Sequence, residues 1–406
     1  MKTLLKMAWR NIWRNKKRTF LTMFSIFLAV FLSLFTRSMQ VGSYSNMISN
    51  AVKLSTGYIQ IHAKGYWEKK SINETFEDSP QLDSLLKNNT NISFVIPRLE
   101  SFALASSGKH TKGAIVIGTN PQIENKLNKY SEKIIKGNYL SENDEAILVS
   151  EKLAEYLNVD VGDSLVLLGQ GYHGITAAAK YRIKGIINFP IPQLNNQLVI
   201  MPLKLSQYFY AVDNRLTSIS LMLNDPESLD ETINDLNNEL KNKYEIMAWQ
   251  EMNKEMVQAI ESDNVGGIIM LAILYIVIGF GVFGTVMMMT MERRKEFAIM
   301  ISVGMQKYKL LQLVALETIL IGMVSILIGI VLSYPFLLYL HNNPIPLTGE
   351  LAASMELFGT EPILPFSIKS GIFINQTISV ILISVLAVIY PLSVILKFNV
   401  LKAMRS

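Results

Sequence analysis

Residues 265–291 read VGGIIMLAILYIVIGFGVFGTVMMMTM and contain no charged side chain. A helix needs about 20 apolar residues to cross the hydrocarbon core of a bilayer, so this stretch predicts a membrane span. Three further apolar runs lie at residues 19–36, 310–340 and 372–396. The chain has 406 residues, of which 50% are hydrophobic and only 17% are charged, and its mean hydropathy is +0.27. These values argue against a disordered chain and an ordinary soluble enzyme, and they predict four membrane spans.

The distribution of charged residues between the apolar runs predicts which segments lie on each side of the membrane. Residues 1–18, 292–309 and 397–406 together carry 15 Lys or Arg and 2 Asp or Glu, whereas residues 38–264 carry 21 basic and 27 acidic side chains. Because Lys and Arg concentrate on the cytoplasmic side of membrane proteins, both termini are predicted to be cytoplasmic and the long segment to lie outside. The basic side faces anionic lipid headgroups, and the acidic outer segment argues against nucleic-acid binding.

The first apolar run has no small-residue cleavage site after it, so we interpret it as an uncleaved span and not as a signal peptide. The outer segment mixes short β-like runs with helical patterns, which predicts an α/β domain. The predicted order is a cytoplasmic interfacial helix at 1–18, a span at 19–40, an extracytoplasmic α/β domain with a stalk at 41–264, a span at 265–291, a cytoplasmic loop at 292–309, a span at 310–340, a short outer loop at 341–371, a span at 372–396 and a cytoplasmic tail at 397–406.

Seven runs of β-forming residues in the outer segment are predicted to be strands. They are Tyr58–His62, Ser93–Ile96, Ala114–Ile117, Ala146–Val149, Ser164–Leu168, Tyr181–Ile187 and Gln197–Met201. Helical patterns occupy residues 150–158, 203–210, 226–243 and 249–262, and the last of these leads directly into the second span. We therefore expect a stalk helix that is continuous with that span.

The N-terminal segment has the pattern of a helix that lies at a membrane surface. In residues 1–18, Leu5, Ala8, Trp9 and Ile12 fall on one helical face beside a basic stripe, which predicts a helix lying in the inner membrane interface. Its interfacial residues are Trp9, Arg10, Trp13 and Arg14.

Five phenylalanines of the first span recur at helical spacing, namely Phe20, Phe24, Phe27, Phe31 and Phe35. Residues at such spacing share one narrow helical face. A stripe that packs against lipid or another helix is the simpler interpretation. The alternative is a groove for an acyl chain or an apolar substrate, lined by Phe24, Phe27, Phe31 and Phe35.

The sequence offers little catalytic chemistry. It has no cysteine, which excludes disulfides, cysteine-ligated zinc and thiol catalysis. It has no G-x-x-x-x-G-K-[ST] phosphate-binding loop, so the chain itself is not expected to be an enzyme or to hydrolyse ATP. The four histidines are scattered along the chain, so no metal site, catalytic residue or directly bound cofactor is predicted.

The most informative motif is MERRKEFAIMISVGMQKYKLLQLVALE at residues 291–317. It resembles the cytoplasmic loop of permeases of the FtsX, MacB and LolC/LolE superfamily of ABC transporters, with Ala298 where the family pattern has glycine. The resemblance implies that 292–306 is the coupling helix that docks on an ATPase subunit. The residues carried over are Glu292, Arg293, Arg294, Lys295, Glu296, Phe297, Gly304 and Met305, with Glu317 at the head of the third span.

Other segments agree with this resemblance. WRNIWRNKKRTFLT at 9–22 resembles the basic N-terminal helix of the family, and YPLSVILKFNVLKAMR at 390–405 resembles its ending. TGYIQIHAKGYW at 56–67 and ILVSEKLAEYLNVDVGDSLVL at 147–167 resemble the lipoprotein-release permease group. The resemblance implies four spans, porter-like and Sabre-like outer subdomains, and a bacterial inner-membrane location. It also implies a second permease copy or paralogue, and two separate ATPase subunits that hold ATP and Mg.

The favoured function is that of a permease subunit that couples ATP hydrolysis by its partner to lipoprotein release. Segment 169–181, GQGYHGITAAAKY, is then a candidate hairpin contacting a soluble periplasmic carrier through Gly171, Tyr172 and His173, and an ordinary hairpin is the alternative. Three other functions stay open. They are a MacB-like periplasmic efflux subunit, an FtsX-like regulator of a cell-wall hydrolase, and a membrane-anchored binding module without an ATPase.

Overall fold

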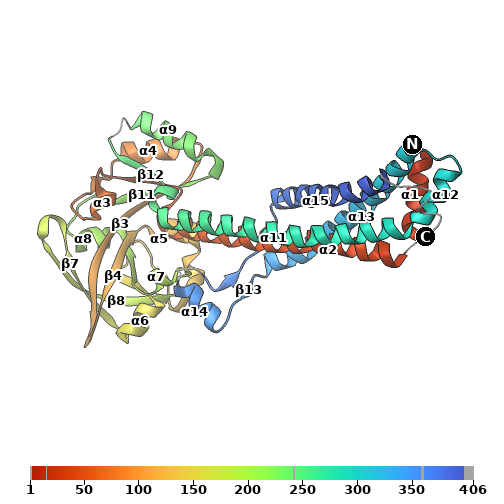
Figure 1. The fold of residues 1–406 in the computed structure, drawn as a ribbon. Coiled ribbons are helices and arrows are strands. Elements are labelled where there is room, and N and C mark those ends of the chain that lie inside the picture. Colours follow the sequence, from red (N-terminus) through yellow and green to blue (C-terminus); the bar gives the residue numbers. More distant parts are fainter. Residues whose placement is uncertain (1, 15, 241–242, 358–360, 397–406) are drawn as a thin grey trace. The chain divides into compact units, whose positions relative to one another are not determined.

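The structure is a computed structural model that describes residues 2–14, 16–240, 243–357 and 361–396 (Figure 1). It divides into a helical unit, Met1–Ser45, Ala259–Pro346 and Ile363–Ser406, and an α/β unit, Asn46–Gln258 and Leu347–Pro362. The basic tail predicted at 397–406 lies outside the described residues.

Long helices build the helical unit. They are α1 (Lys2–Arg14), α2 (Lys16–Ala51), α11 (Lys254–Glu292), α12 (Arg294–Ser302), α13 (Lys307–Asn342) and α15 (Ser370–Leu396), with a small hairpin of β13 (Ile345–Pro346) and β14 (Ile363–Leu364). Figure 1 shows α2 and α11 running side by side, and Arg37 and Tyr44 of α2 hydrogen-bond to Asn264 and Asp263 of α11 at 2.7 and 2.5 Å. The apolar core of the unit is drawn from α2, α11, α13 and α15.

Within the described residues, three helices are long and apolar enough to cross a membrane: Thr19–Thr56, Lys254–Glu292 and Lys307–Asn342. A shorter apolar helical stretch, Ser370–Leu386, follows at the position of the predicted fourth span. The helices are longer than the apolar runs, since α11 has 39 residues and is about 58 Å long at 1.5 Å per residue. The predicted stalk is therefore continuous with the second span from Lys254, after a break that follows the short helix α10 (Trp249–Met252).

Small residues let α2 and α13 approach closely. A Cβ placed on Gly329 of α13 would lie 2.8 Å from the Val30 side chain of α2, closer than real Cβ atoms come to their neighbours. Val30 and Ser33 on this face of α2 are fully buried. Such close helix contacts are typical of membrane bundles, where packing replaces the hydrophobic driving force.

The α/β unit is built on a ten-stranded mixed sheet of order β12-β1-β11-β3-β4-β9-β6-β8-β5, with β7 paired to β3 and β8. The strands are β1 (Ile59–His62), β3 (Ile92–Ser107), β4 (His110–Thr119), β5 (Ile134–Gly137), β6 (Ala146–Ser150), β7 (Ser164–Gln170), β8 (Thr176–Ile187), β9 (Leu198–Pro202), β11 (Ser218–Leu223) and β12 (Glu245–Ala248), with β2 (Phe76–Glu77) and β10 (Arg215–Leu216) forming a separate pair. The main helices are α4 (Pro80–Asn88), α5 (Pro121–Asn128), α6 (Glu151–Leu157), α8 (Leu203–Phe209) and α9 (Leu229–Glu239), and α14 (Glu350–Leu357) also belongs to this unit.

The long strand β3 connects two hydrophobic cores. Its first part, up to Arg98, pairs with β11, and its second part, from Arg98 onward, pairs with β4 and β7. One core includes β1, β11, α4 and α9, and the other includes β4, β6, β7, β8, β9 and α6. Arg98 is the residue at which the pairing of β3 changes from β11 to β4. Its side chain is 1% exposed and forms a buried ion pair with Glu124 of α5 at 2.8 Å.

All seven predicted strands are present, and β3 extends eleven residues beyond its predicted end at Ile96 to Ser107. Strand β11 was not predicted because all six of its residues are buried, which removes the alternation that marks a half-buried strand. Helix α5 was not among the predicted helices, and it begins two residues after the end of β4 at Thr119. Asn120 caps this helix by accepting hydrogen bonds from the N–H groups of Gln122 and Ile123, and Pro121 occupies its first turn.

We expect Gly329→Ala to destabilise the helical unit, because the added methyl group collides with Val30. Overpacking of this kind costs about 1–3 kcal/mol. Gly322→Ala on the same helix is the matched control, since a Cβ there meets no atom within 4 Å. Thermal unfolding of the two variants in lipid discs measures the difference. Equal midpoints would show that the α2–α13 contact is not as close as described.

Candidate functional site

The candidate site lies in the helical unit where α1, α12 and α13 meet. Glu317 of α13 is buried, with 3% of its side chain exposed, and it forms an ion pair with Arg293, the residue before α12. Asn11 of α1 donates a hydrogen bond to the other carboxylate oxygen of Glu317. One buried carboxylate therefore fixes three segments that are far apart in the sequence. We call this set of residues, Asn11, Arg293 and Glu317, the ionic joint.

Apolar packing supports the ionic joint. Phe297 and Ala298 of α12 pack against Leu310 and Val314 of α13, and all four are buried. The Arg293 guanidinium lies 5.2 Å from the centre of the Phe297 ring, a distance at which a cation is attracted to an aromatic face. Phe297 is thus directed inward, where it holds α12 against α13.

A second, more exposed ion pair extends the ionic joint. Arg14 at the end of α1 pairs with Glu296, which Arg293 also approaches at 3.3 Å. Burial would raise the pKa of Glu296, but the hydrogen bond and charge of Arg14, followed by those of Arg293, outweigh it and hold that pKa below its usual value. Glu296 therefore remains ionised at neutral pH, and the ends of α1 and α12 stay linked by charge.

The loop between the second and third long apolar helices also carries apolar side chains that are exposed and not packed against α13. Val303 is 83% exposed, and Ile299 and Tyr308 are also largely exposed. Gly304 has φ of +103°, a conformation that residues with a side chain rarely adopt, and it ends α12 in a turn to α13. These exposed apolar side chains, which we call the loop patch, are Ile299, Val303 and Tyr308.

Sequence reasoning missed the loop patch. Ile299 and Val303 stand four residues apart, and Lys295 precedes them at the same spacing, so all three fall on one side of the helix. Of the predicted coupling residues, Arg293, Glu296 and Phe297 gather with Glu317, whereas Glu292, Arg294 and Lys295 are exposed. Met305 is half-buried and packs against the Phe297 core.

Two of the four residues on the predicted apolar face of α1 are buried within the helical unit. Ala8 and Ile12 are buried, whereas Leu5, Trp9 and Trp13 are exposed. The Trp9 and Trp13 rings meet edge to face with centroids 6.0 Å apart, and Arg10 and Arg14 are exposed beside them. Amphipathic rings flanked by basic side chains are typical of headgroup level.

The predicted phenylalanine stripe forms a continuous aromatic ladder. Successive rings from Phe20 to Phe35 stack with centroids 5.9 to 6.4 Å apart. Phe20 and Phe24 are exposed at one end. At the other end Phe35 contacts Phe336 of α13 and Phe366 at 6.3 and 5.2 Å. The ladder therefore presents an open apolar end and a packed end.

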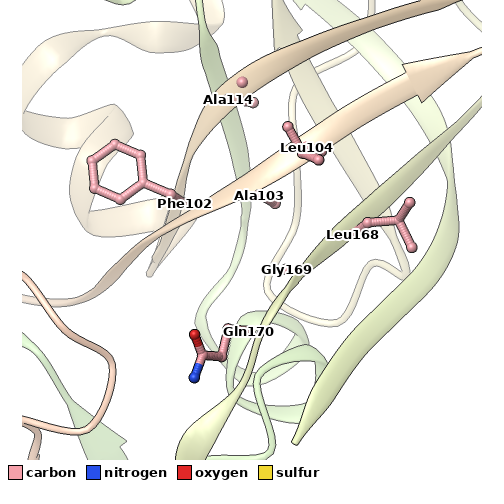
Figure 2. A pocket seen from close by; sticks show the side chains of 8 residues that line it. Phe102, Ala103, Leu104, Ala114, Leu168, Gly169 and Gln170 are labelled. Carbon is pink, nitrogen blue, oxygen red and sulfur yellow. The ribbon is translucent and has the colours of Figure 1, made fainter. Parts of the chain in front are cut away.

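An apolar hollow of about 490 Å³ lies on the sheet of the α/β unit. Figure 2 shows Phe102 and Leu104 of β3 and Leu168 of β7 around it, with Gln170 at the end of β7. Phe102 is 61% exposed, and Leu104 and Leu168 are also exposed. Exposed apolar side chains gathered in this way are typical of a contact surface.

The predicted carrier-contact segment connects β7 and β8, which pair as an antiparallel hairpin. Its tip is tied to the rest of the unit, since the N–H of Tyr172 donates to the Tyr210 carbonyl at 2.9 Å and the N–H of His173 donates to Asn73 at 2.8 Å. The N–H of Gly171 donates to the Ile175 carbonyl at 2.7 Å. A role in contacting a carrier remains a prediction.

Among the described residues, no three His, Asp or Glu side chains gather in a way that could hold a metal ion. His62 is buried in the sheet, where desolvation and the charge of Lys70 lower its pKa to about 3. Its imidazole is therefore neutral at physiological pH. Its Nε2 lies 2.6 Å from Gln60 Oε1, which makes it part of a buried polar network.

Comparison with known proteins defines the class of this chain. Residues 19–239, more than half of the chain, match the MacB-like periplasmic core domain, and residues 268–400 match the FtsX-like permease C-terminal domain. The chain belongs to the superfamily of FtsX-, MacB- and LolC/LolE-type permeases.

Individual relatives are distant. The chain is 22% identical to the lipoprotein-releasing system transmembrane protein LolC of Xylella fastidiosa, over 61% of this chain and 61% of that protein. It is 23% identical to the corresponding LolE protein of Haemophilus influenzae over 67% of each. The alignment thus spans less than two thirds of the Xylella relative's length. The periplasmic region of MacB from Actinobacillus actinomycetemcomitans is 16% identical with a TM-score of 0.35, covering 51% of this chain and 95% of that structure.

Removing one member of the ionic joint should destabilise the helical unit strongly. Glu317→Ala leaves the Arg293 guanidinium buried without its counter-charge, which costs about 3–5 kcal/mol. The double variant Arg293→Met with Glu317→Leu removes both charges and should recover most of this loss. Thermal unfolding in lipid discs measures both variants.

The control for that measurement is Glu155→Gln, which removes an exposed pair with Lys152 and should change the free energy of unfolding by less than about 1 kcal/mol. A Glu317→Ala protein as stable as this control would contradict a buried ionic joint.

Proposed function

We propose that this chain is the permease subunit of an ABC transporter, working with a separate ATPase subunit that binds ATP and Mg. The observation that carries this proposal is the ionic joint beneath the exposed loop patch. A helix that receives force needs a rigid attachment to the membrane helices and a free surface toward the partner. Arg293, Glu317 and Phe297 provide the attachment, and Ile299, Val303 and Tyr308 provide the surface.

The proposed topology has four membrane spans in a bacterial inner membrane, with both termini cytoplasmic. It is supported by the three long apolar helices, by the apolar stretch Ser370–Leu386, and by the 15 basic and 2 acidic residues of the segments placed inside. The two cores of the α/β unit are proposed to correspond to the porter-like and Sabre-like subdomains. A second permease copy or paralogue would complete the assembly.

The proposed mechanism is mechanical. Movement of the ATPase subunits displaces α12 through the loop patch. The ionic joint passes this displacement to α13 and α1 together, because Glu317 is bonded to both neighbouring segments. Packed interfaces switch between discrete arrangements and do not deform continuously, so a small shift at α12 moves whole helices. The chain itself carries out no chemical step in this scheme.

Release of lipoproteins from the membrane is the cargo function we propose. The LolC and LolE proteins to which the chain is similar are named as lipoprotein-releasing system proteins. The aromatic ladder offers an apolar surface for acyl chains, exposed at Phe20 and Phe24. The hollow around Phe102 and the nearby hairpin offer surfaces for a soluble carrier.

Charge placed in the loop patch should separate the ATPase from the permease. We expect Ile299→Asp with Val303→Asp to abolish co-purification of the ATPase and to lower ATP hydrolysis by the complex at least about tenfold, since a desolvated apolar contact would receive two charges. Tyr208→Asp in the α/β unit is the control, because Tyr208 is as exposed as Val303. Unchanged association in a correctly inserted double variant would refute the coupling role of α12.

Acidic residues in the aromatic ladder should block lipoprotein release. We expect Phe27→Asp with Phe31→Asp to stop release while ATP hydrolysis in the absence of lipoprotein persists. Each acid costs about 2.5–3.5 kcal/mol at the centre of a spanning helix, so insertion is measured first. Met323→Asp with Leu327→Asp on the exposed face of α13 carries the same cost and should retain release. Equal loss in both pairs would remove the ladder from the proposed path.

A further inference from the structure

The first part of β3 has an open edge. Residues Ile92–Pro97 pair with β11 on one side. On the other side β4 ends at Thr119, which is opposite Arg98, and the chain turns into α5. Within the described residues no strand continues beside Ile92–Pro97 on that side. Unpaired strand edges present free N–H and C=O groups that bind extended peptides.

Hydrogen-bond alternation identifies the free groups. The Pro97 carbonyl accepts a hydrogen bond from the Thr119 hydroxyl at 3.4 Å, so it points toward the open side, whereas the Arg98 carbonyl accepts from Thr217 and points toward β11. Because main-chain groups alternate along a regular strand, the N–H and C=O groups of Val95 point to the open side together with the Pro97 carbonyl. The pairing with β11 shifts register at Ser93, where the alternation is interrupted.

A groove runs along this edge. One cavity of about 220 Å³ is lined by Ile92, Ser93, Phe94 and Val95 of β3, together with side chains of α4 and α5. Successive side chains of a strand point to opposite faces, so four consecutive residues can line one cavity only if the strand edge faces it. A second cavity of about 500 Å³ shares Val95, Ile123 and Lys87 with the first and extends it past Pro97.

The groove has an apolar floor and walls of unlike charge. Val95, Pro97 and Ile219 form part of the floor, with Ile123 and Leu203 at its sides. The Ile92 end is bordered by Lys87 and Lys126. The Pro97 end is bordered by Asp78, Glu142 and Lys204, and among the described residues neither acid forms an ion pair. Desolvation, with repulsion from Asp83, raises the pKa of Asp78 and outweighs the opposing charge of Lys87.

We propose that this groove binds an extended peptide segment of a partner protein, which adds a strand to the open edge of β3 and places an acidic side chain near Lys126 and a basic side chain near Asp78 and Glu142. Main-chain hydrogen bonds to Val95 and to the Pro97 carbonyl supply affinity, and the floor accepts every second side chain of the peptide. The site is separate from the hollow around Phe102 and does not depend on the transport function proposed above.

The test uses the full chain in lipid discs and a phage-displayed library of random linear heptapeptides. Selected peptides are synthesised, and hydrogen exchange of the 92–97 segment is measured with and without them. We expect slower exchange at Val95. We also expect an acidic residue near one end of the peptides, and N-methylation at alternate peptide nitrogens to weaken binding at least about tenfold.

Lys126→Glu is the matched variant, since Lys126 is exposed and an exposed substitution is expected to change stability little. It should weaken the selected peptides at least about tenfold, whereas Lys180→Glu on β8, also exposed, should not. The proposal is overturned if no selected peptide loses affinity for Lys126→Glu. It is equally overturned if the bound peptides protect the strands around Phe102 and Leu168 and leave Val95 unprotected.

Discussion

A buried carboxylate with two partners holds the helical unit in its arrangement. Glu317 lies on a helix of strongly apolar sequence, where an unpaired charge is costly. The pairing with Arg293 and Asn11 compensates this cost only when α1, α12 and α13 are in place together. The packing of Phe297 against α13 lies directly beside this pairing and depends on the same placement of α12.

The two candidate contact surfaces of the α/β unit lie on parts of its sheet that other elements leave uncovered. The hollow around Phe102 lies on a face of β3 and β7 that no helix covers among the described residues, and the peptide groove lies where β4 stops beside β3. Proteins usually cover or charge such edges to prevent aggregation. Here side chains of α4 and α5 line the cavity beside the open edge, with Lys87 and Lys126 at its border, so the edge is partly covered and charged.

The sequence predicts the helices well because their signal is local. Hydropathy identified the three long helices, the spacing of the phenylalanines identified the aromatic ladder, and Glu317 stood out as an acid in an apolar run. The partners of Glu317 were not predictable in the same way, since Asn11 is 306 positions away and no pattern joins the two. Strand β11 was missed because burial on both faces removes its alternation, and without β11 the open edge of β3 could not be foreseen. From the sequence alone, Ile299 and Val303 cannot be distinguished from core residues of a helix. The structure shows that Phe297 occupies the buried face of α12, which leaves Ile299 and Val303 exposed.

The length of β3 also bears on how the α/β unit loses its structure. One strand of 16 residues supplies both cores, and a shift of one residue in its pairing would turn its apolar side chains to the wrong face in each. The two halves of the α/β unit, one around each core, are therefore poor candidates for independent folding units, because neither can open without withdrawing β3 from the other. Melting of the α/β unit should accordingly be a single cooperative event, and a fragment that ends within β3 should not form a stable half.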